Sequence, residues 1–369
     1  MNELVRAIPY LGSRYPKSTR WILIALIAVA PLVTALFGNT WVRILDFALL
    51  YVMLAIGLNL VVGFAGLLDL GYIAFYAVGA YTWAFLASPH FGVHWPFWIV
   101  LPLGAAFAAF AGILLGFPVL RLRGDYLAIV TLGFGEIVRI FMNNLNYPVN
   151  ITNGPQGINS LDPLRIFGWD LSRNIRIGDD FVINSLWLYY YAFLLFVIAS
   201  VVLIQRLQVS RIGRAWAAIR DDELAAKAVG IDVRNMKLMA FAMGATFGGV
   251  AGGLFGAFQG FVSPESFSLM ESIAVLTMVV FGGMGNLAGV IVGALALSIL
   301  PEVMRSVAIP MQQALFGSVL LDPEVMRMLL LALAMIFMML LRPAGLLPPH
   351  SRYSKPSLVL DKRGTEASE

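Results

Sequence analysis

An acid and a base stand together inside an otherwise apolar stretch of the sequence. Glu136 and Arg139 are three positions apart within Tyr126–Met142, a spacing that places both side chains on one face of a helix. Opposite charges so placed can pair, which favours a mutually neutralised pair that holds a helix interface. The alternative is direct contact with a polar ligand, because ionisable groups are costly in apolar helices and are retained where they have a role.

Two glycine-rich segments separate other apolar stretches. Asp69 lies within Gly63–Gly71, between Gly66 and Gly71, and either caps the following helix or contacts a ligand. The second segment contains Gly282, Gly283 and Gly285, and it is either a tight turn between two helices or a break inside one longer helix. Glycine permits both readings because it adopts positive φ and lets backbones approach closely.

Several other kinds of chemistry are excluded or disfavoured. The chain has no cysteine, so it has no disulfide, thiolate metal site or Cys nucleophile. His90 and His94 have a metal-ligand spacing only if helical, and the prolines around them disfavour a helix. No lysine follows a glycine, so a phosphate-binding P-loop is absent and ATP must act through a partner, or an ion gradient must replace it. We expect no metal and no cofactor in this chain.

The elements that position these residues are membrane helices. Hydrophobic residues make up 60% of the 369 residues and charged residues only 12%, whereas soluble domains have about 25% charged residues. The composition therefore predicts an all-α, polytopic membrane bundle. We expect about ten transmembrane helices of roughly 20 residues each, at Trp21–Phe37, Ile44–Val62, Leu70–Ala87, Phe97–Leu120, Tyr126–Met142, Leu186–Ile204, Lys237–Phe258, Phe267–Phe281, Leu287–Leu300 and Val325–Leu341.

The placement of the basic residues predicts the orientation. Most of the 25 Lys and Arg residues fall in segments that this arrangement puts on one side, and basic loops stay in the cytoplasm. Both termini are therefore expected inside. The predicted parts are a cytoplasmic tail at 1–20, a transmembrane domain at 21–342 with a periplasmic loop at 143–185 and a cytoplasmic loop at 205–236, and a second cytoplasmic tail at 343–369.

The cytoplasmic loop is too long for a simple connection. Its residues from Ala215 to Gly230 favour one helix, with Asp221 and Asp222 near the middle and Gly230 just past the end. Because Ala225 and Ala226 are small, a partner could approach the backbone closely there. We therefore predict that this helix is a docking surface.

The chain resembles the LivM family, the permease subunits of branched-chain amino acid ABC importers. The resemblance is carried in order by segments at 66–81, 120–139, 152–158, 213–223, 259–267, 282–285 and 342–348. It implies an importer in which this chain pairs with a LivH-like second permease. Two ATP-binding subunits, which hold ATP and Mg²⁺, would dock at the cytoplasmic face, and a periplasmic amino-acid-binding protein would deliver substrate. It also implies the lipid bilayer of the bacterial inner membrane as surroundings and no nucleic acid as a partner.

The family has a cytoplasmic docking motif of Glu-Ala-Ala, three residues and Gly. Ala225, Ala226 and Gly230 fit this motif, whereas Leu224 occupies the Glu position and Glu223 falls one residue earlier. The resemblance thus implies a role in ATPase coupling for Arg214, Arg220, Asp222, Glu223, Ala225, Ala226 and Gly230. Candidates for the translocation path or for helix breaks are Asp69, Gly66, Gly71, Glu136, Arg139, Gly282, Gly283 and Gly285.

Other functions stay open at this point. Related ABC permeases carry urea, short amides or other amino acids, and the sequence does not separate these from leucine, isoleucine and valine. A lone ion-coupled transporter would use Asp69, Glu136 or Glu271 as a proton relay. A scaffold protein is disfavoured because polar residues and glycines interrupt so many of the spans.

Overall fold

The computed structural model describes residues 30–35, 38–119, 122, 124–166, 169–177, 181–316, 323–342 and 344–347, and the chain is mostly helical within them. The long helices are α3 (Asn39–Asn59), α5 (Phe97–Val119), α6 (Asp125–Asn144), α7 (Ser185–Val209), α10 (Val233–Gln259), α12 (Leu287–Phe316) and α13 (Pro323–Leu341). The shorter helices are α4 (Ile73–Leu86), α8 (Arg211–Asp221), α9 (Glu223–Ala228) and α11 (Leu269–Gly282).

Seven helical segments in the described part of the chain are long and apolar enough to cross a membrane. They are Asn39–Phe64, Phe97–Pro118, Tyr126–Asn144, Ser185–Val209, Val233–Gln259, Pro264–Gly282 and Leu287–Ser306. A polytopic helical membrane protein is thereby confirmed. The predicted first span, Trp21–Phe37, lies largely outside the described residues, as do the tail 1–20 and residues 348–369, so ten spans and two cytoplasmic termini stay predictions.

Three predicted spans differ in extent from the helices observed. The span expected at Leu287–Leu300 is α12, which continues to Phe316 as one 30-residue helix. The span expected at Leu70–Ala87 contains the 14-residue helix α4, which begins only at Ile73. The residues before it form a non-helical segment that follows a π-helical turn, η1 (Leu60–Phe64), at the end of α3. The span expected at Phe267–Phe281 is α11, which begins at Leu269. A 3-10 turn, η3 (Pro264–Phe267), comes before it.

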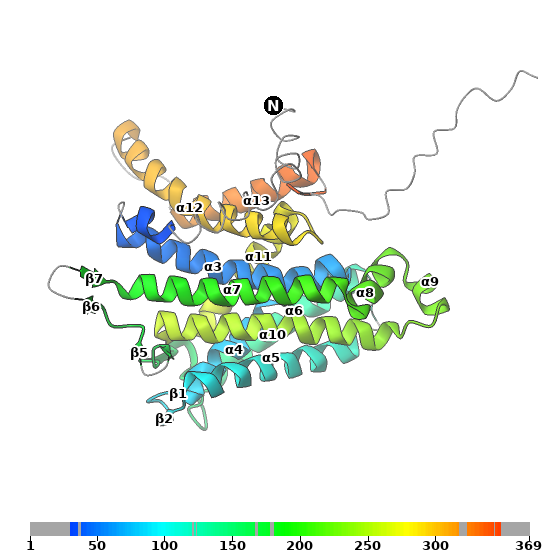
Figure 1. The fold of residues 1–369 in the computed structure, drawn as a ribbon, viewed down its shortest axis with the longest axis horizontal. Coiled ribbons are helices and arrows are strands. Elements are labelled where there is room, and N and C mark those ends of the chain that lie inside the picture. Colours follow the sequence, from blue (N-terminus) through cyan, green and yellow to red (C-terminus); the bar gives the residue numbers. More distant parts are fainter. Residues whose placement is uncertain are drawn as a thin grey trace, which may run out of the picture.

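The two long loops lie at opposite ends of the bundle (Figure 1). Helices α8 and α9 extend beyond one end of the long helices, whereas the strands of the 143–185 loop lie at the other end. That these loops face opposite sides of a membrane stays a prediction.

The loop regions contain short antiparallel strand pairs that an all-α prediction did not include. The pairs are β1 (Ala87–Ser88) with β2 (Val93–His94), β3 (Ile158–Asn159) with β8 (Phe261–Val262), β4 (Arg165–Ile166) with β5 (Trp169–Asp170) and β6 (Ile175–Ile177) with β7 (Phe181–Ile183). A 3-10 turn, η2 (Gly154–Gln156), precedes β3. The β3–β8 pair ties the 143–185 loop to the segment between α10 and α11.

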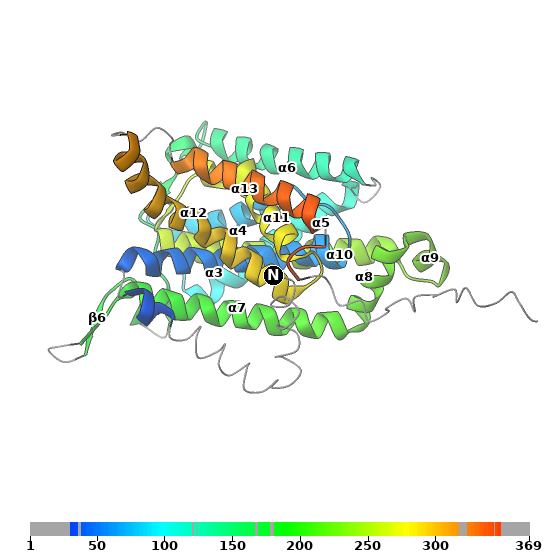
Figure 2. The same cartoon turned by 90° about the horizontal axis from the view of Figure 1, so that it is seen from above.

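Helix α10 forms the centre of the bundle, where it packs against α5 and α4. Glycines make this close approach possible, because a Cβ at Gly79 of α4 would collide with the backbone of Gly249 of α10. A Cβ at Gly252 would likewise collide with the backbone of Tyr76. Small residues that let helix backbones meet are a common means of packing helices in lipid. In the view from above, α12 and α13 lie over α3, α11 and α4, and α6 runs along one edge (Figure 2).

Candidate functional site

The 205–236 loop does not form the single helix predicted from Ala215 to Gly230. Asp222 has an extended conformation (φ −156°, ψ 110°) that separates α8 from α9. Its Oδ1 accepts hydrogen bonds from the backbone N–H groups of Leu224 (2.8 Å) and Ala225 (3.0 Å), so Asp222 is the N-cap of α9. The prediction that Asp222 lies in the middle of a helix is therefore wrong, because its carboxylate satisfies the first N–H groups of a new helix.

The end of the second helix agrees with the prediction for Gly230. Helix α9 stops at Ala228, and Gly230 has φ +88°, a conformation that other residues adopt only with strain. A Cβ at Gly230 would meet no atom within 4 Å, so the backbone conformation alone favours glycine. Asp232 then accepts a hydrogen bond from the N–H of Asn235 (3.2 Å) and caps α10.

Two buried side chains fix α8 and α9 against the start of α10. Trp216 of α8 is 1% exposed, and its indole N–H donates to the carbonyl of Met236 (2.8 Å). Lys237 of α10 is 6% exposed, and its Nζ lies 2.8 Å from Oε2 of Glu223. Glu223 therefore holds the loop helices to a span.

The two alanines of the docking motif face opposite ways. Ala226 is 3% exposed and packs inside the chain, so a partner cannot approach the backbone there as predicted. Ala225 is exposed. The large apolar side chains of Leu224 (67% exposed) and Val229 (77% exposed) lie near it in sequence. We call Leu224, Ala225 and Val229 the apolar tip.

Arg220 connects α8 to two of the glycine-rich segments. Its Nη1 donates to the backbone carbonyl of Gly63 at the end of η1. A Cβ at Gly66 would lie 3.1 Å from Cγ of Arg220, and a Cβ at Gly285 would collide with the Arg220 guanidinium. The N–H of Gly285 donates to Oδ1 of Asn59 (2.8 Å), the last residue of α3, so α3 also contacts the turn at Gly285. Arg220, Gly66 and Gly285, predicted for separate roles, thus meet in one place.

The segment from Gly282 to Gly285 is a tight turn between α11 and α12. Gly283 (φ +115°) and Gly285 (φ +84°) both have positive φ, which resolves the question left open by the sequence. The N–H groups of Leu346 and Leu347 donate to the carbonyls of Phe281 (2.9 Å) and Gly282 (3.1 Å). The residues that follow α13 therefore brace this turn.

Asp69 lies in the non-helical segment that leads into α4, and its side chain is fully buried. Oδ1 accepts a hydrogen bond from the N–H of Gly71 (2.9 Å), so Asp69 stabilises the turn before α4 rather than the first turn of the helix itself. Oδ2 has no hydrogen-bond partner within the described residues. Position 71 accommodates only glycine, because the Cβ of any other residue there would collide with the backbone of Thr131.

Neighbouring spans hold this segment through Leu70. Its N–H donates to Oγ1 of Thr131 in α6 (3.0 Å), and its carbonyl accepts from Oγ of Ser272 in α11. Thr131 is fully buried and Ser272 is 1% exposed. Movement of the segment at Leu70 must therefore displace α6 and α11 or break these bonds.

Glu136 and Arg139 form the predicted pair on α6, but a third residue joins them. Nε of Arg139 lies 3.1 Å from Oε1 of Glu136, and Nη1 lies 3.1 Å from Oε1 of Glu265, which belongs to η3. The side chains of Arg139, Glu136 and Glu265 are 23%, 36% and 60% exposed. The group is thus a partly exposed triad that ties α6 to the segment before α11, rather than a buried pair.

The family of the chain follows from its sequence. The model of the family described as "Branched-chain amino acid transport system / permease component" matches residues 40–340. The chain belongs to this family. That match covers the apolar core of the chain from α3 to α13 and includes every residue described in this section except those that brace the Gly282–Gly285 turn.

Individual relatives agree with the family assignment of this permease. The high-affinity branched-chain amino acid transport system permease protein LivM of Escherichia coli (strain K12) is 44% identical, over 94% of this chain and 78% of that protein. A probable LivM permease of Methanocaldococcus jannaschii is 24% identical over 74% of each chain. The LivH permease protein of E. coli (strain K12) is 25% identical over 68% of this chain and 80% of its own length. No solved structure matches the permease.

Sequence reasoning missed several residues that connect the candidate sites. Asn59, Trp216, Lys237, Thr131 and Ser272 are polar or amphipathic residues that make the bonds described above. Lys237, at the start of a predicted span, could have indicated an ion pair, because an ammonium group there requires a partner. Thr131 and Ser272 gave no signal, because hydroxyl groups in membrane helices usually bond their own backbone.

Proposed function

We propose that this permease is a transmembrane subunit of an ABC importer that passes leucine, isoleucine and valine from a periplasmic binding protein to the cytoplasm. Identity of 44% over 94% of the chain to a LivM permease carries the proposal. The second permease would be LivH-like, and two separate subunits would bind and hydrolyse ATP with Mg²⁺. The chain itself would act in the inner membrane without a cofactor, by alternating access driven from the cytoplasmic side.

The apolar tip is the proposed contact for an ATP-binding subunit. Leu224 and Val229 are large apolar side chains that project into water at the end of the molecule where α8 and α9 lie (Figure 1). Exposed apolar surface of this kind is suited to burial by a protein partner. The two loop helices are held in place for such a contact, because the Trp216–Met236 hydrogen bond and the Lys237–Glu223 ion pair attach them to α10.

The contacts of α8 suggest how closure of the ATPases would reach the membrane. Force on α8 would act through Arg220 on the end of η1 at Gly63 and on the turn at Gly285. The segment after η1 is bonded at Leu70 to α6 and α11 through Thr131 and Ser272. One cytoplasmic contact would thereby displace two glycine-rich segments and two spans together.

A proton-coupled transporter acting alone has less support. Of the three carboxylates suited to a proton relay, Glu136 is paired with Arg139 and Glu271 accepts a hydrogen bond from the hydroxyl of Tyr51 (2.8 Å). The third carboxylate, Asp69, still has one oxygen, Oδ2, without a hydrogen-bond partner among the described residues, so it is the remaining candidate for a relay.

Uptake by reconstituted vesicles tests the proposal. Vesicles with both permeases, the ATP-binding subunits and the binding protein should accumulate labelled leucine only with internal ATP, and excess isoleucine or valine should compete. Uptake by this chain alone along a proton gradient would overturn the proposal in favour of a secondary transporter. Competition by urea or short amides, without competition by isoleucine, would overturn the assigned substrate class.

Docking is tested with variants of the apolar tip. Leu224→Ser and Val229→Ser should weaken co-purification of the ATP-binding subunits. Trp169→Ser is the matched control, since Trp169 is also a large apolar residue, 63% exposed, but belongs to strand β5, which lies at the opposite end of the molecule (Figure 1). Equal co-purification of all three variants would refute docking at the apolar tip.

A further inference from the structure

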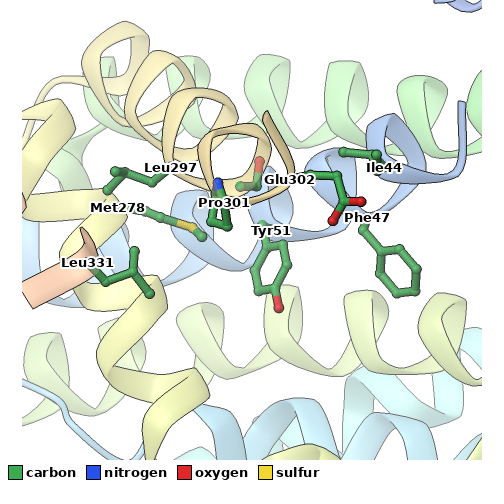
Figure 3. Close-up of a pocket in the computed structure, with 9 residues that line it drawn as sticks. Ile44, Phe47, Tyr51, Met278, Leu297, Pro301, Glu302 and Leu331 are labelled. Atoms are coloured by element: carbon green, nitrogen blue, oxygen red, sulfur yellow. The ribbon is translucent and has the colours of Figure 1, made fainter. Parts of the chain in front are cut away.

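A pocket of about 300 Å³ lies between α3, α11, α12 and α13 (Figure 3). This volume is at the lower end of the range of pockets that hold small ligands. Its walls are mainly apolar, with Ile44 and Phe47 on α3 and Leu331 on α13. Among the described residues that line it, Glu302 of α12 is the one that carries a charge.

A proline in α12 accounts for the opening. Pro301 lines the pocket and lies inside the helix, where it lacks the N–H that would bond the carbonyl of Leu297. Prolines at such positions kink helices. Toward its C-terminal end α12 diverges from α3 (Figure 1), and Phe47 of α3 lines the pocket.

Glu302 is unpaired within the described part of the chain. Its carboxylate is half-buried and has no hydrogen bond or ion pair with any residue in the described ranges. It lies in the apolar segment Leu287–Ser306, about 22 Å along the axis from the start of α12 at 1.5 Å per residue. An unpaired carboxylate in such a segment is costly, so a partner that brings positive charge would be favoured there.

The neighbours of Glu302 indicate what else that partner carries. Arg305 is exposed and lies one helical turn further along α12, beyond the pocket lining. A ligand with an ammonium group at Glu302 could thus place an anionic group near Arg305 and an apolar tail against Phe47 and Leu331. α12 and α13 also carry the exposed apolar side chains of Val292 and Leu333, so hydrocarbon is suited to the surface beside the pocket.

We propose that this pocket binds a phospholipid whose headgroup carries a primary ammonium, such as phosphatidylethanolamine. The ammonium donates hydrogen bonds to Glu302, the phosphate lies beside Arg305, and the start of an acyl chain fills the apolar part of the pocket. A branched-chain amino acid has the same charged groups, but it brings no long chain to continue into the surrounding bilayer. The lipid therefore uses both the charge and the apolar surface around the pocket.

The test compares lipids that differ only in the headgroup. The assembled transporter is placed in nanodiscs of phosphatidylethanolamine, phosphatidylcholine or phosphatidylglycerol, and its melting temperature and retained lipid are measured, the latter by native mass spectrometry. We expect the highest melting temperature and the most retained lipid with phosphatidylethanolamine. The trimethylammonium of phosphatidylcholine has no N–H to donate, and phosphatidylglycerol has no ammonium.

Glu302→Gln should abolish the preference for phosphatidylethanolamine, whereas Ser298→Ala, a change at an uncharged lining residue, should retain it. Leu331→Trp should fill the pocket and lower retention of lipid even if Glu302→Gln assembles poorly. The proposal is overturned if Glu302→Gln or Leu331→Trp retains phosphatidylethanolamine like the wild type. It is also overturned if free leucine, and no phospholipid, stabilises the wild type in a manner that depends on Glu302.

Discussion

Arg220 of the loop helix α8 donates a hydrogen bond through Nη1 to the backbone carbonyl of Gly63, which lies 157 positions earlier, at the end of the first described span. The bond is significant because it joins a loop helix to the point where a span stops being helical. Arg220 also lies against Gly66 and Gly285. A single side chain therefore touches both glycine-rich segments that the sequence marks as interruptions.

The cap at Asp222 should control the order of α9. Asp222→Ala removes the acceptor for two backbone N–H groups, and loss of such a cap costs about 1 kcal/mol. Because α9 has only six residues, we expect its end to fray and trypsin to cleave faster after the exposed Lys227. Asp222→Asn should keep the wild-type rate, since asparagine caps equally well. Equal cleavage of the alanine variant and the wild type would show that the cap is unimportant.

Removal of Glu223 should destabilise the joint between α9 and α10. Glu223→Gln leaves the nearly buried ammonium of Lys237 without its carboxylate, and an unsatisfied buried polar group costs about 1–3 kcal/mol. We expect a lower melting temperature for the isolated permease. The double variant Glu223→Gln/Lys237→Met should recover part of the loss. If the double variant is less stable than Glu223→Gln alone, the two residues do not act as a pair.

The triad of Glu136, Arg139 and Glu265 should tolerate the loss of one carboxylate. Arg139 keeps a partner in either single variant, and partly exposed ion pairs contribute only about 0.2–1 kcal/mol. Glu136→Gln and Glu265→Gln should each reduce the level of assembled complex slightly. The double variant should reduce it by more than the sum of both, because Arg139 then has no carboxylate partner. Strict additivity would contradict the triad.

The hydroxyl of Thr131 should be needed to hold Leu70. Thr131→Val preserves the side-chain volume but leaves the N–H of Leu70 without its acceptor, at a cost of about 1–3 kcal/mol. We expect a lower melting temperature and reduced uptake. Thr131→Ser retains the hydroxyl and should behave like the wild type in both measurements. Wild-type uptake by Thr131→Val would show that the link from Leu70 to α6 is dispensable.

The sequence predicted the membrane helices well because apolar length alone identifies them. Ser185–Val209 and Val233–Gln259, for example, contain the predicted spans with only small differences at their ends. The pairing of Glu136 with Arg139 was also predictable, since residues three apart on a helix are neighbours.

Contacts between distant segments could not be predicted in the same way. Glu265 lies 126 positions from Arg139, and nothing in either local sequence links them. The partner of Arg220 is a backbone carbonyl, which has no sequence signature. The break at Asp222 was missed because Ala, Leu, Glu and Lys on both sides favour one continuous helix, whereas the cap depends on how the loop folds back onto α10.

The link from α8 to the spans is tested by the ratio of ATP hydrolysed to leucine imported, measured in the fully reconstituted transporter that carries Arg220→Ala. Arg211→Ala is the matched control, because Arg211 is an exposed arginine at the start of the same helix. If α8 drives the spans through Arg220, the Arg220→Ala transporter should still bind the ATP-binding subunits and hydrolyse ATP. Leucine uptake per ATP should fall about tenfold, as expected for loss of a hydrogen bond from a charged group. Arg211→Ala should keep the wild-type ratio. An unchanged ratio in Arg220→Ala would show that α8 does not drive the spans through Arg220.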